Sequence, residues 1–370
     1  MPARLPKRVP SARCTCVVLV ALFVALLAWQ ASAQQAFARC AQLRPQDQMW
    51  LVSSRGSGCN VEQQAPGMAC WRFDPEARWV RASVAELFAA DDGHLVTTIF
   101  VHGNRMAHSD AFARGSEAYR AMLRCADERP VRFIIWSWPS AQIRGPIKDA
   151  RVKAQRTNLA GCYLAWFLNR LSPETTVSLW GHSFGARVVT GALHILGGGT
   201  LGSYRIAVRE EPRVPANVVL ITAALDNHWL APGHFHGRAL SQVGSLLLVN
   251  NGCDRLLKRY HWLYHRRACA QALGYTGMPR CWMGQCGCHL EQVNACCIVG
   301  PEHTLDGYLY SRSLMARMQR VLMFEPIDEL TPDEPATSST KMGGEEFSVG
   351  EELPPANDES SDGPVLPAIP

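Results

Sequence analysis

Residues 177–187 read V-S-L-W-G-H-S-F-G-A-R, and this stretch decides the fold. Its apolar first part is typical of a buried strand, and residues 184–196 have the composition of a helix. The pentapeptide G-H-S-F-G at 181–185 joins the strand to the helix. It therefore lies at a sharp strand–turn–helix bend, which exposes the Ser183 hydroxyl at the end of a strand. Gly181 and Gly185 leave the room that such a bend requires. We predict that Ser183 is a nucleophile, and the alternative is an ordinary helix-capping serine.

Apolar, β-branched segments recur along the chain and alternate with segments of helical periodicity. We expect strands at residues 49–53, 95–101, 131–136, 175–180, 217–223 and 245–250, and helices at 109–124, 147–170 and 184–196. This alternation is typical of a mostly parallel central sheet with helices on both faces, so the predicted fold class is α/β. Residues 56–93 are expected to be loop-rich, because Gly, Pro and Cys interrupt any regular pattern there.

A polar loop, His102-Gly103-Asn104, directly follows the expected strand at 95–101. Attack of a serine on a carbonyl creates an oxyanion, which two backbone N–H groups should meet. One donor would be Phe184, the residue after the nucleophile, and the other would be Asn104 or Gly103 in this loop. The alternative is a turn that contains a buried, hydrogen-bonded His102.

A nucleophilic serine needs a base, and the base needs an orienting acid. In the strand–helix arrangement expected here, these groups follow the serine in the order acid, then histidine. Asp254 comes soon after the last strongly apolar strand, and His303 is the last histidine of the chain. Asp226, which ends the preceding strand region, is the competing acid, and His289 is the competing base.

Three segments together resemble the α/β-hydrolase superfamily: T-T-I-F-V-H-G-N, F-I-I-W-S-W-P-S and L-W-G-H-S-F-G-A-R. The segment W-S-W-P-S with the following K-D-A-R is similar to a bacterial branch of exported serine hydrolases, and the resemblance spans residues 95–310. It implies an α/β-hydrolase fold and cleavage of an ester, thioester or amide through an acyl-enzyme. It carries the catalytic roles onto Ser183, Asp254 and His303, and the oxyanion roles onto the positions given above.

A cysteine-rich segment, residues 258–300, interrupts the strand–helix alternation. It contains Cys269, Cys281, Cys286, Cys288, Cys296 and Cys297. We interpret it as an insertion near the carboxyl-terminal edge of the sheet, where such folds place ligands. Zinc ligation that includes His289 is an alternative, but the spacing C-x4-C-x-C-H-x6-C-C does not repeat the paired C-x2-C of structural zinc sites. Disulfides are the simpler interpretation, and we expect no metal and no organic cofactor.

The two ends of the chain differ from its centre. Residues 1–33 combine a basic start, a 13-residue apolar run at 17–29 and a terminal A-S-A, as a secretory signal peptide does. An uncleaved membrane anchor is the alternative. Residues 326–370 carry 11 acids and one base, and we expect a disordered acidic tail. Two of the 14 cysteines lie within residues 1–33, and the twelve that remain are an even number, as disulfides in an oxidising compartment require. We therefore predict an exported protein, periplasmic or secreted.

The central part, residues 34–325, is the predicted hydrolase domain. It carries 32 bases and 21 acids, and this excess favours an anionic envelope surface such as lipid headgroups. A nucleic-acid partner is not expected, because no recognised reading motif accompanies the charge. The expected partner is a small-molecule or lipid-like acyl substrate.

Four tryptophans near expected strand ends could line an acyl pocket or belong to the core; they are Trp136, Trp138, Trp180 and Trp229.

Two other functions remain open at the level of sequence. One is a non-catalytic binding module that keeps the fold without turnover. The other is a cell-envelope factor tethered to the membrane by residues 17–29.

Overall fold

The computed structural model describes residues 43–58, 67–91, 93–124, 128–211, 213–263, 271–283 and 287–324. The predicted signal peptide at 1–33 and the predicted acidic tail at 326–370 lie outside these residues. No helix in the described ranges has the length and apolar character that crossing a membrane requires.

A mixed sheet of nine strands forms the centre of the described chain. The strands are β1 (Gln48–Ser53), β2 (Ala69–Asp74), β3 (Arg78–Ala82), β4 (Val96–Val101), β5 (Val131–Ser137), β6 (Val177–His182), β7 (Ala216–Ile221), β8 (Val243–Asn250) and β9 (His289–Asn294). Their spatial order is β3-β2-β1-β5-β4-β6-β7-β8-β9. The pairs β1–β2 and β2–β3 are antiparallel and all other neighbours are parallel. The predicted α/β class with a mostly parallel sheet is therefore confirmed.

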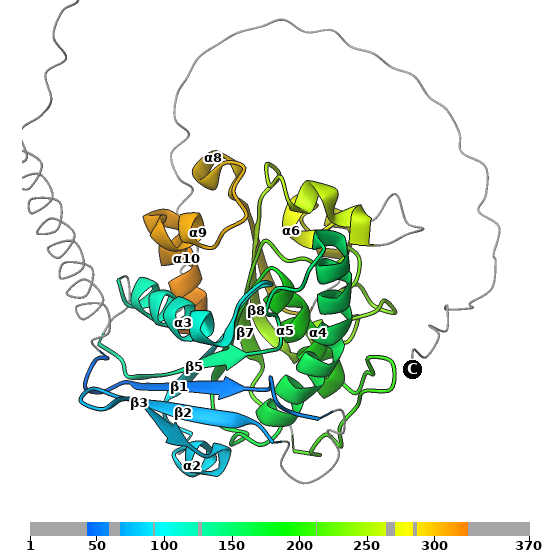
Figure 1. Cartoon of the computed structure of the whole chain (residues 1–370). Coiled ribbons are helices and arrows are strands. Elements are labelled where there is room, and N and C mark those ends of the chain that lie inside the picture. Colours follow the sequence, from blue (N-terminus) through cyan, green and yellow to red (C-terminus); the bar gives the residue numbers. More distant parts are fainter. Residues whose placement is uncertain are drawn as a thin grey trace, which may run out of the picture. The chain divides into compact units, whose positions relative to one another are not determined.

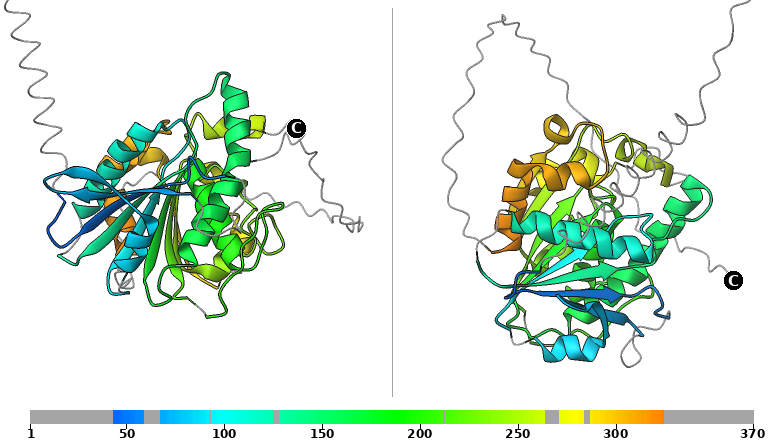
Figure 2. Two further views of the ribbon diagram at one scale, coloured as in Figure 1. Left: turned by 60° about the horizontal axis from the view of Figure 1, so that its bottom comes forward. Right: turned by 60° about the vertical axis from the view of Figure 1, so that its left-hand side comes forward.

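Helices cover both faces of this sheet (Figures 1 and 2). They are α2 (Val84–Ala89), α3 (His108–Leu123), α4 (Pro146–Leu168), α5 (Phe184–Leu196), α6 (Leu273–Thr276), α7 (Arg280–Met283), α8 (Cys296–Val299), α9 (Asp306–Tyr310) and α10 (Arg312–Leu322), with 3-10 segments η1 (Ala239–Gln242) and η2 (Leu257–Leu263). Helices α4 and α5 pack on one face, and α3, α9 and α10 pack on the other.

The two-residue period of each strand divides its side chains between the two faces. In β6, Leu179 belongs to the core under α4 and α5, and the next residue, Trp180, belongs to the core under α3 and α10. Trp180 packs edge-on against Phe100 of β4, and both rings are fully buried. Since both faces are covered, the central strands are almost continuously apolar, which is why sequence alone locates them.

The order of the strands creates a crevice at one place. Strand β4 lies between β5 and β6. The chain continues from β4 to β5 on one side, and it then crosses to β6 on the other side of β4. In doubly wound sheets, ligands bind outside the carboxyl ends of the strands at this switch point. The loop at 102–104 follows β4 and Ser183 follows β6, so the topology brings both predicted elements to the crevice.

Three strands differ from the sequence prediction. Strands β2 and β3 occupy part of the segment at 56–93 that was expected to be loop-rich. Strand β9 lies inside the predicted insertion at 258–300, where it pairs in parallel with β8 and completes the sheet. The insertion hypothesis is therefore wrong for β9. Its sequence H-L-E-Q-V-N has no fully buried residue, because an edge strand is covered on fewer sides and has no apolar signature.

A disulfide joins Cys253, just after β8, to Cys296 at the start of α8. The predicted disulfide chemistry is confirmed for this pair, which removes Cys296 from the alternative zinc set. In the described ranges, no three His, Cys, Asp or Glu side chains are grouped so that they could hold a metal ion. Cys269 and Cys286 lie outside the described residues.

The disulfide should make a large contribution to stability, because its cysteines are 43 residues apart in the chain. Closing such a loop lowers the entropy of the unfolded chain, and we expect Cys253→Ser to lower the free energy of unfolding by about 4 kcal/mol. Denaturant titration with and without reductant measures this loss. The control is Cys297→Ser, since Cys297 is exposed and adjacent to Cys296 but outside this bond. Equal stability of both variants would contradict the assignment.

Candidate active site

Ser183 lies at the turn between β6 and α5, in a backbone conformation that L-residues rarely adopt (φ 53°, ψ −118°). Neighbouring backbone holds the turn in place. The Ser183 N–H donates to the carbonyl of Ile221 at 3.0 Å, and the N–H of Ala224 donates to the Ser183 carbonyl at 3.2 Å. Such strain persists only where the surroundings enforce it, and it is concentrated at functional sites.

Close backbone contacts explain why glycine stands at positions 181 and 185, on either side of Ser183. A Cβ on Gly185 would lie 2.0 Å from the carbonyl oxygen of Val101, at the end of β4. A Cβ on Gly181 would lie 2.8 Å from the Cα of Ala186. The turn therefore packs backbone against backbone, and only glycine fits at either position.

Ser183, His303 and Asp254 form one continuous chain of hydrogen bonds. The Ser183 hydroxyl lies 2.9 Å from Nε2 of His303, and Nδ1 of His303 lies 2.6 Å from Oδ2 of Asp254. Asp254 is fully buried and His303 is 17% exposed at the side chain. With Nδ1–H donating to the carboxylate, Nε2 is free to accept the serine proton, which is the tautomer that general-base chemistry needs.

The structure places the competing residues elsewhere. Asp226 is buried, and its Oδ1 accepts a hydrogen bond from the hydroxyl of Tyr260 at 2.6 Å. His289 is exposed on the edge strand β9, in register with Ser245. Of the predicted acids and bases, the structure thus brings Asp254 and His303 to Ser183.

The loop after β4 is held by a buried histidine. His102 is fully buried and stacks on Trp138, whose N–H groups donate to Nε2 and to the carbonyl of His102 at 3.4 and 2.8 Å. Burial lowers the pKa of His102 to about 3, so the ring is neutral, and its Nδ1–H donates to the Gly103 carbonyl at 2.9 Å. Because C=O and N–H point in opposite directions in a trans peptide, the Asn104 N–H points away from this ring.

A buried ion pair at the start of α4 fixes the Asn104 side chain. Asn104 Nδ2 donates to Asp149 at 3.0 Å. The same carboxylate accepts from Arg105 Nε at 3.1 Å, Lys153 Nζ at 2.9 Å and the Ile143 N–H at 3.0 Å. Burial alone would raise the pKa of Asp149, but these hydrogen bonds outweigh it and hold the pKa below its ordinary value.

The predicted oxyanion donors lie at the pocket. Phe184 and Asn104 line it together with Ser183, and neither backbone N–H has an acceptor in the described part of the chain. The Phe184 N–H also stands at the amino end of α5, where the helix dipole favours negative charge. Gly103 lies directly against Ser183, since a Cβ there would come within 3.2 Å of the Ser183 Cβ, but it does not line the pocket.

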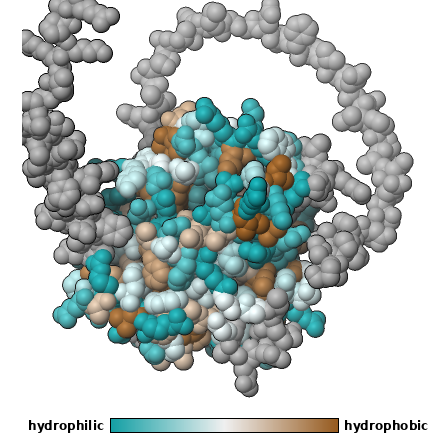
Figure 3. All heavy atoms as spheres, in the orientation of Figure 1, coloured by the Kyte–Doolittle hydropathy of each residue, from teal (hydrophilic) through white to brown (hydrophobic). Residues whose placement is uncertain are grey.

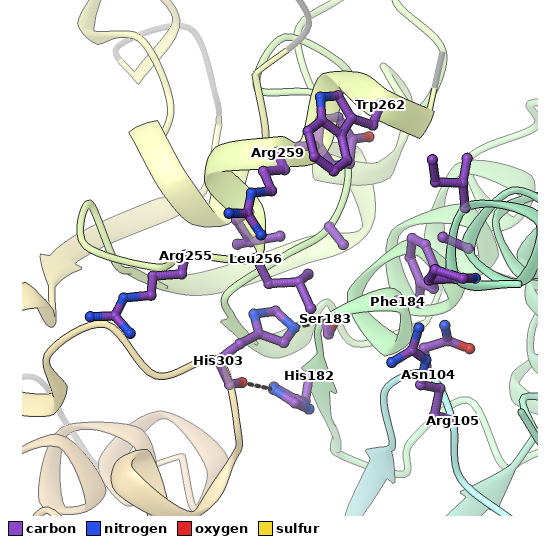
Figure 4. Close-up of a pocket in the computed structure, with 16 residues that line it drawn as sticks. Asn104, Arg105, His182, Ser183, Phe184, Arg255, Leu256, Arg259, Trp262 and His303 are labelled. Carbon is purple, nitrogen blue, oxygen red and sulfur yellow. Dashed lines mark hydrogen bonds between the residues drawn. The ribbon is translucent and has the colours of Figure 1, made fainter. Parts of the chain in front are cut away.

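His182 was not predicted from sequence, although it lies between Gly181 and Ser183. Its Nε2 donates to the backbone carbonyl of His303 at 3.1 Å (Figure 4). Desolvation and the neighbouring His303 lower the pKa of His182 to about 3, so the ring is a neutral donor. His182 therefore ties residues 181–185, which we call the serine turn, to residues 300–303, which we call the histidine loop. No sequence signal could have revealed a bond to backbone so far along the chain.

Asn251 and Tyr308 hold the histidine loop from the other side. Asn251 Nδ2 donates to the Gly300 carbonyl and to the Tyr308 hydroxyl, both at 2.8 Å. The Tyr308 hydroxyl donates in turn to the carbonyl of Glu302 at 3.3 Å. The backbone that precedes His303 is thus fixed independently of the histidine ring.

A pocket of about 560 Å³ opens in front of Ser183. Apolar side chains form most of its wall; they are Pro146, Ile147, Ala150, Phe184, Ala224, Leu256, Leu257, Tyr260 and Trp262. None of the four tryptophans singled out from the sequence lines it, and all four are buried in the core. The interpretation of these four as core residues is therefore confirmed, and Trp262 of η2 is the tryptophan that lines the pocket (Figure 4).

No protein-family model matches the chain, and no curated protein matches its sequence. The geometry of the described residues therefore carries the functional proposal.

The buried pair Asp149–Lys153 should support both the stability of the protein and the position of the loop at 102–104. Asp149→Asn leaves Lys153 buried without its counter-charge, and we expect a loss of about 3–5 kcal/mol in the free energy of unfolding. Adding Lys153→Met should recover part of this loss, because no buried charge then remains. Denaturant unfolding measures these changes. Lys148→Met is the control, since Lys148 is an exposed cation on the same helix; a loss as large as that of Asp149→Asn would contradict the account.

The same pair sets a pH dependence. The folded-state pKa of Asp149 lies below its ordinary value, so its stabilisation is complete above the unfolded pKa of about 4. It is lost as the pH falls through the lower folded pKa. Stability measured between neutral and acid pH should therefore fall more steeply in the wild type than in Asp149→Asn.

Proposed function

We propose that this protein is a serine hydrolase of the α/β-hydrolase superfamily, which cleaves a carboxylic ester through an acyl-enzyme. The hydrogen-bonded chain from Ser183 through His303 to Asp254, in front of an apolar pocket, carries this proposal. The order of these residues along the chain, each after a parallel strand, supports the superfamily.

The reaction would begin when Ser183 Oγ attacks the substrate carbonyl and a bond forms between Oγ and the carbonyl carbon. His303 Nε2 takes the hydroxyl proton, and Asp254 stabilises the resulting imidazolium. The N–H groups of Phe184 and Asn104 would bind the oxyanion. The bond to the leaving group then breaks, and His303 passes the proton to the leaving oxygen.

Hydrolysis of the acyl-enzyme would repeat these steps with water. His303 takes a proton from water, the hydroxide attacks the acyl carbon, and the proton returns to Ser183 Oγ as the acid departs. This chemistry needs no metal and no organic cofactor. Thioesters and amides would follow the same route. The apolar wall near Ile147 and Phe184 supports an acyl chain as the part of the substrate that the pocket holds.

The proposed setting is an exported one. The disulfide between Cys253 and Cys296 supports this, because such bonds persist in oxidising compartments and are rare in the cytosol.

Hydrolysis of 4-nitrophenyl esters with acyl chains of increasing length tests the proposal. Wild type should hydrolyse them, and Ser183→Ala and His303→Ala should each lower kcat by at least about 10³-fold, because either change removes the activated nucleophile. Ser109→Ala is the matched control, since Ser109 is an exposed serine of α3, and it should keep full activity.

Equal activity of Ser183→Ala would contradict the proposal. A folded wild-type protein that hydrolyses none of these esters would instead favour a non-catalytic binding module of the same fold.

A further inference from the structure

Two arginines, Arg255 and Arg259, line the pocket. Arg255 and Arg259 belong to residues 255–262, which we call the rim segment, and both are exposed. No acid in the described part of the chain pairs with either one, and no acidic residue of that part lines the pocket. A third lining arginine, Arg105, is already paired with Asp149. The pocket therefore has a local excess of positive charge.

The rim segment is fixed by the same carboxylate that orients His303. Asp254 Oδ1 accepts hydrogen bonds from the N–H groups of Leu256 at 2.8 Å and Leu257 at 2.9 Å. The Arg255 N–H donates to the carbonyl of Pro301 in the histidine loop at 3.2 Å. Backbone hydrogen bonds to Asp254 and Pro301 thus fix the segment that carries both arginines next to the histidine loop.

The view into the pocket agrees with this placement. Figure 4 shows Arg255 and Arg259 on the side of His303, and Asn104 and Phe184 on the other side of Ser183. The Arg259 guanidinium lies over the ring of Trp262, 5.4 Å from its centroid, which limits the conformations it can adopt. In Figure 3, hydrophobic and hydrophilic surfaces lie next to each other near α6 and the upper end of α4.

The side of His303 is the side of the leaving group. His303 Nε2 must hand its proton to the leaving oxygen, so the leaving group has to lie next to this ring. An anion carried by the leaving group would then lie on the side of the pocket from which Arg255 and Arg259 come. A guanidinium binds carboxylate and phosphate groups through paired, charge-assisted hydrogen bonds.

We infer that the leaving group of the ester cleaved at Ser183 carries a carboxylate or phosphate group, which Arg255 and Arg259 bind. The acyl chain of this ester lies against the apolar wall near Phe184. This inference rests on the proposed function and adds the charge of the substrate to it. Arg255 and Arg259 are then specificity-determining residues.

Two butyrate esters with the same chromophore test the inference. One is 4-nitrophenyl butyrate, and the other is the butyrate ester of 5-hydroxy-2-nitrobenzoic acid, whose leaving group has an added carboxylate. The variants are Arg255→Gln, Arg259→Gln and the double variant. Lys258→Gln is the matched control, because Lys258 is an exposed cation of the same segment that does not line the pocket.

We expect the double variant to raise KM for the anionic ester by about tenfold or more, because charge-assisted hydrogen bonds to the substrate are lost. The ratio of KM for the anionic ester to KM for the neutral ester should rise accordingly, and each single variant should show part of this rise. Comparing the ratio of the two esters between proteins cancels their different intrinsic reactivity. Salt should weaken the preference of the wild type and leave the double variant unaffected.

The inference would be overturned if the ratio of the KM values for the two esters were the same in the wild type, the double variant and Lys258→Gln. Hydrolysis of the neutral ester that still depends on Ser183 would leave the proposed function standing in that case. A loss of the preference in Lys258→Gln as large as in the double variant would also overturn it, because a diffuse surface field and not the pocket arginines would then be responsible.

Discussion

The buried carboxylate of Asp254 is the interaction on which the rest of the site depends. Its Oδ2 binds His303, and its Oδ1 accepts two backbone N–H groups at the start of η2. A carboxylate that is fully removed from water is costly unless its lone pairs are satisfied, so the histidine loop and η2 have to take up their positions together. The orientation of His303 and the wall of the pocket are therefore two consequences of one buried group.

The residues next to Asp254 strengthen this coupling. Asn251 holds the backbone of the histidine loop, and Cys253 is bonded to Cys296 in the segment that leads to it. From the serine turn, His182 donates a hydrogen bond to the carbonyl of His303. The backbone around His303 thus has several further contacts besides the bond from its ring to Asp254. Preorganisation of this kind is what the proposed role of His303 as a general base requires.

The parts of this site that were predictable from sequence are those with a strong local pattern. Strands β4 and β6 are buried on both faces and read as apolar runs, and the glycines around Ser183 mark a close backbone contact. Chain order then pointed to the acid and the histidine. Strand β9 escaped prediction because an exposed edge strand has no apolar run. Trp262 escaped it because η2 is a short, kinked segment without a helical period, so its pocket-facing residues follow no pattern.

The rate at which a fluorophosphonate modifies Ser183 tests the central role of Asp254 most directly. Intact-mass measurements should show one adduct on the wild type, and peptide mapping should place it on Ser183. Asp254→Asn should react slower by about 10³–10⁴-fold, because His303 then loses the carboxylate that sets its tautomer. Asp226→Asn should react at nearly the wild-type rate, since Asp226 is bonded to Tyr260. Equal rates for Asp254→Asn and wild type, or a larger loss in Asp226→Asn, would contradict the account.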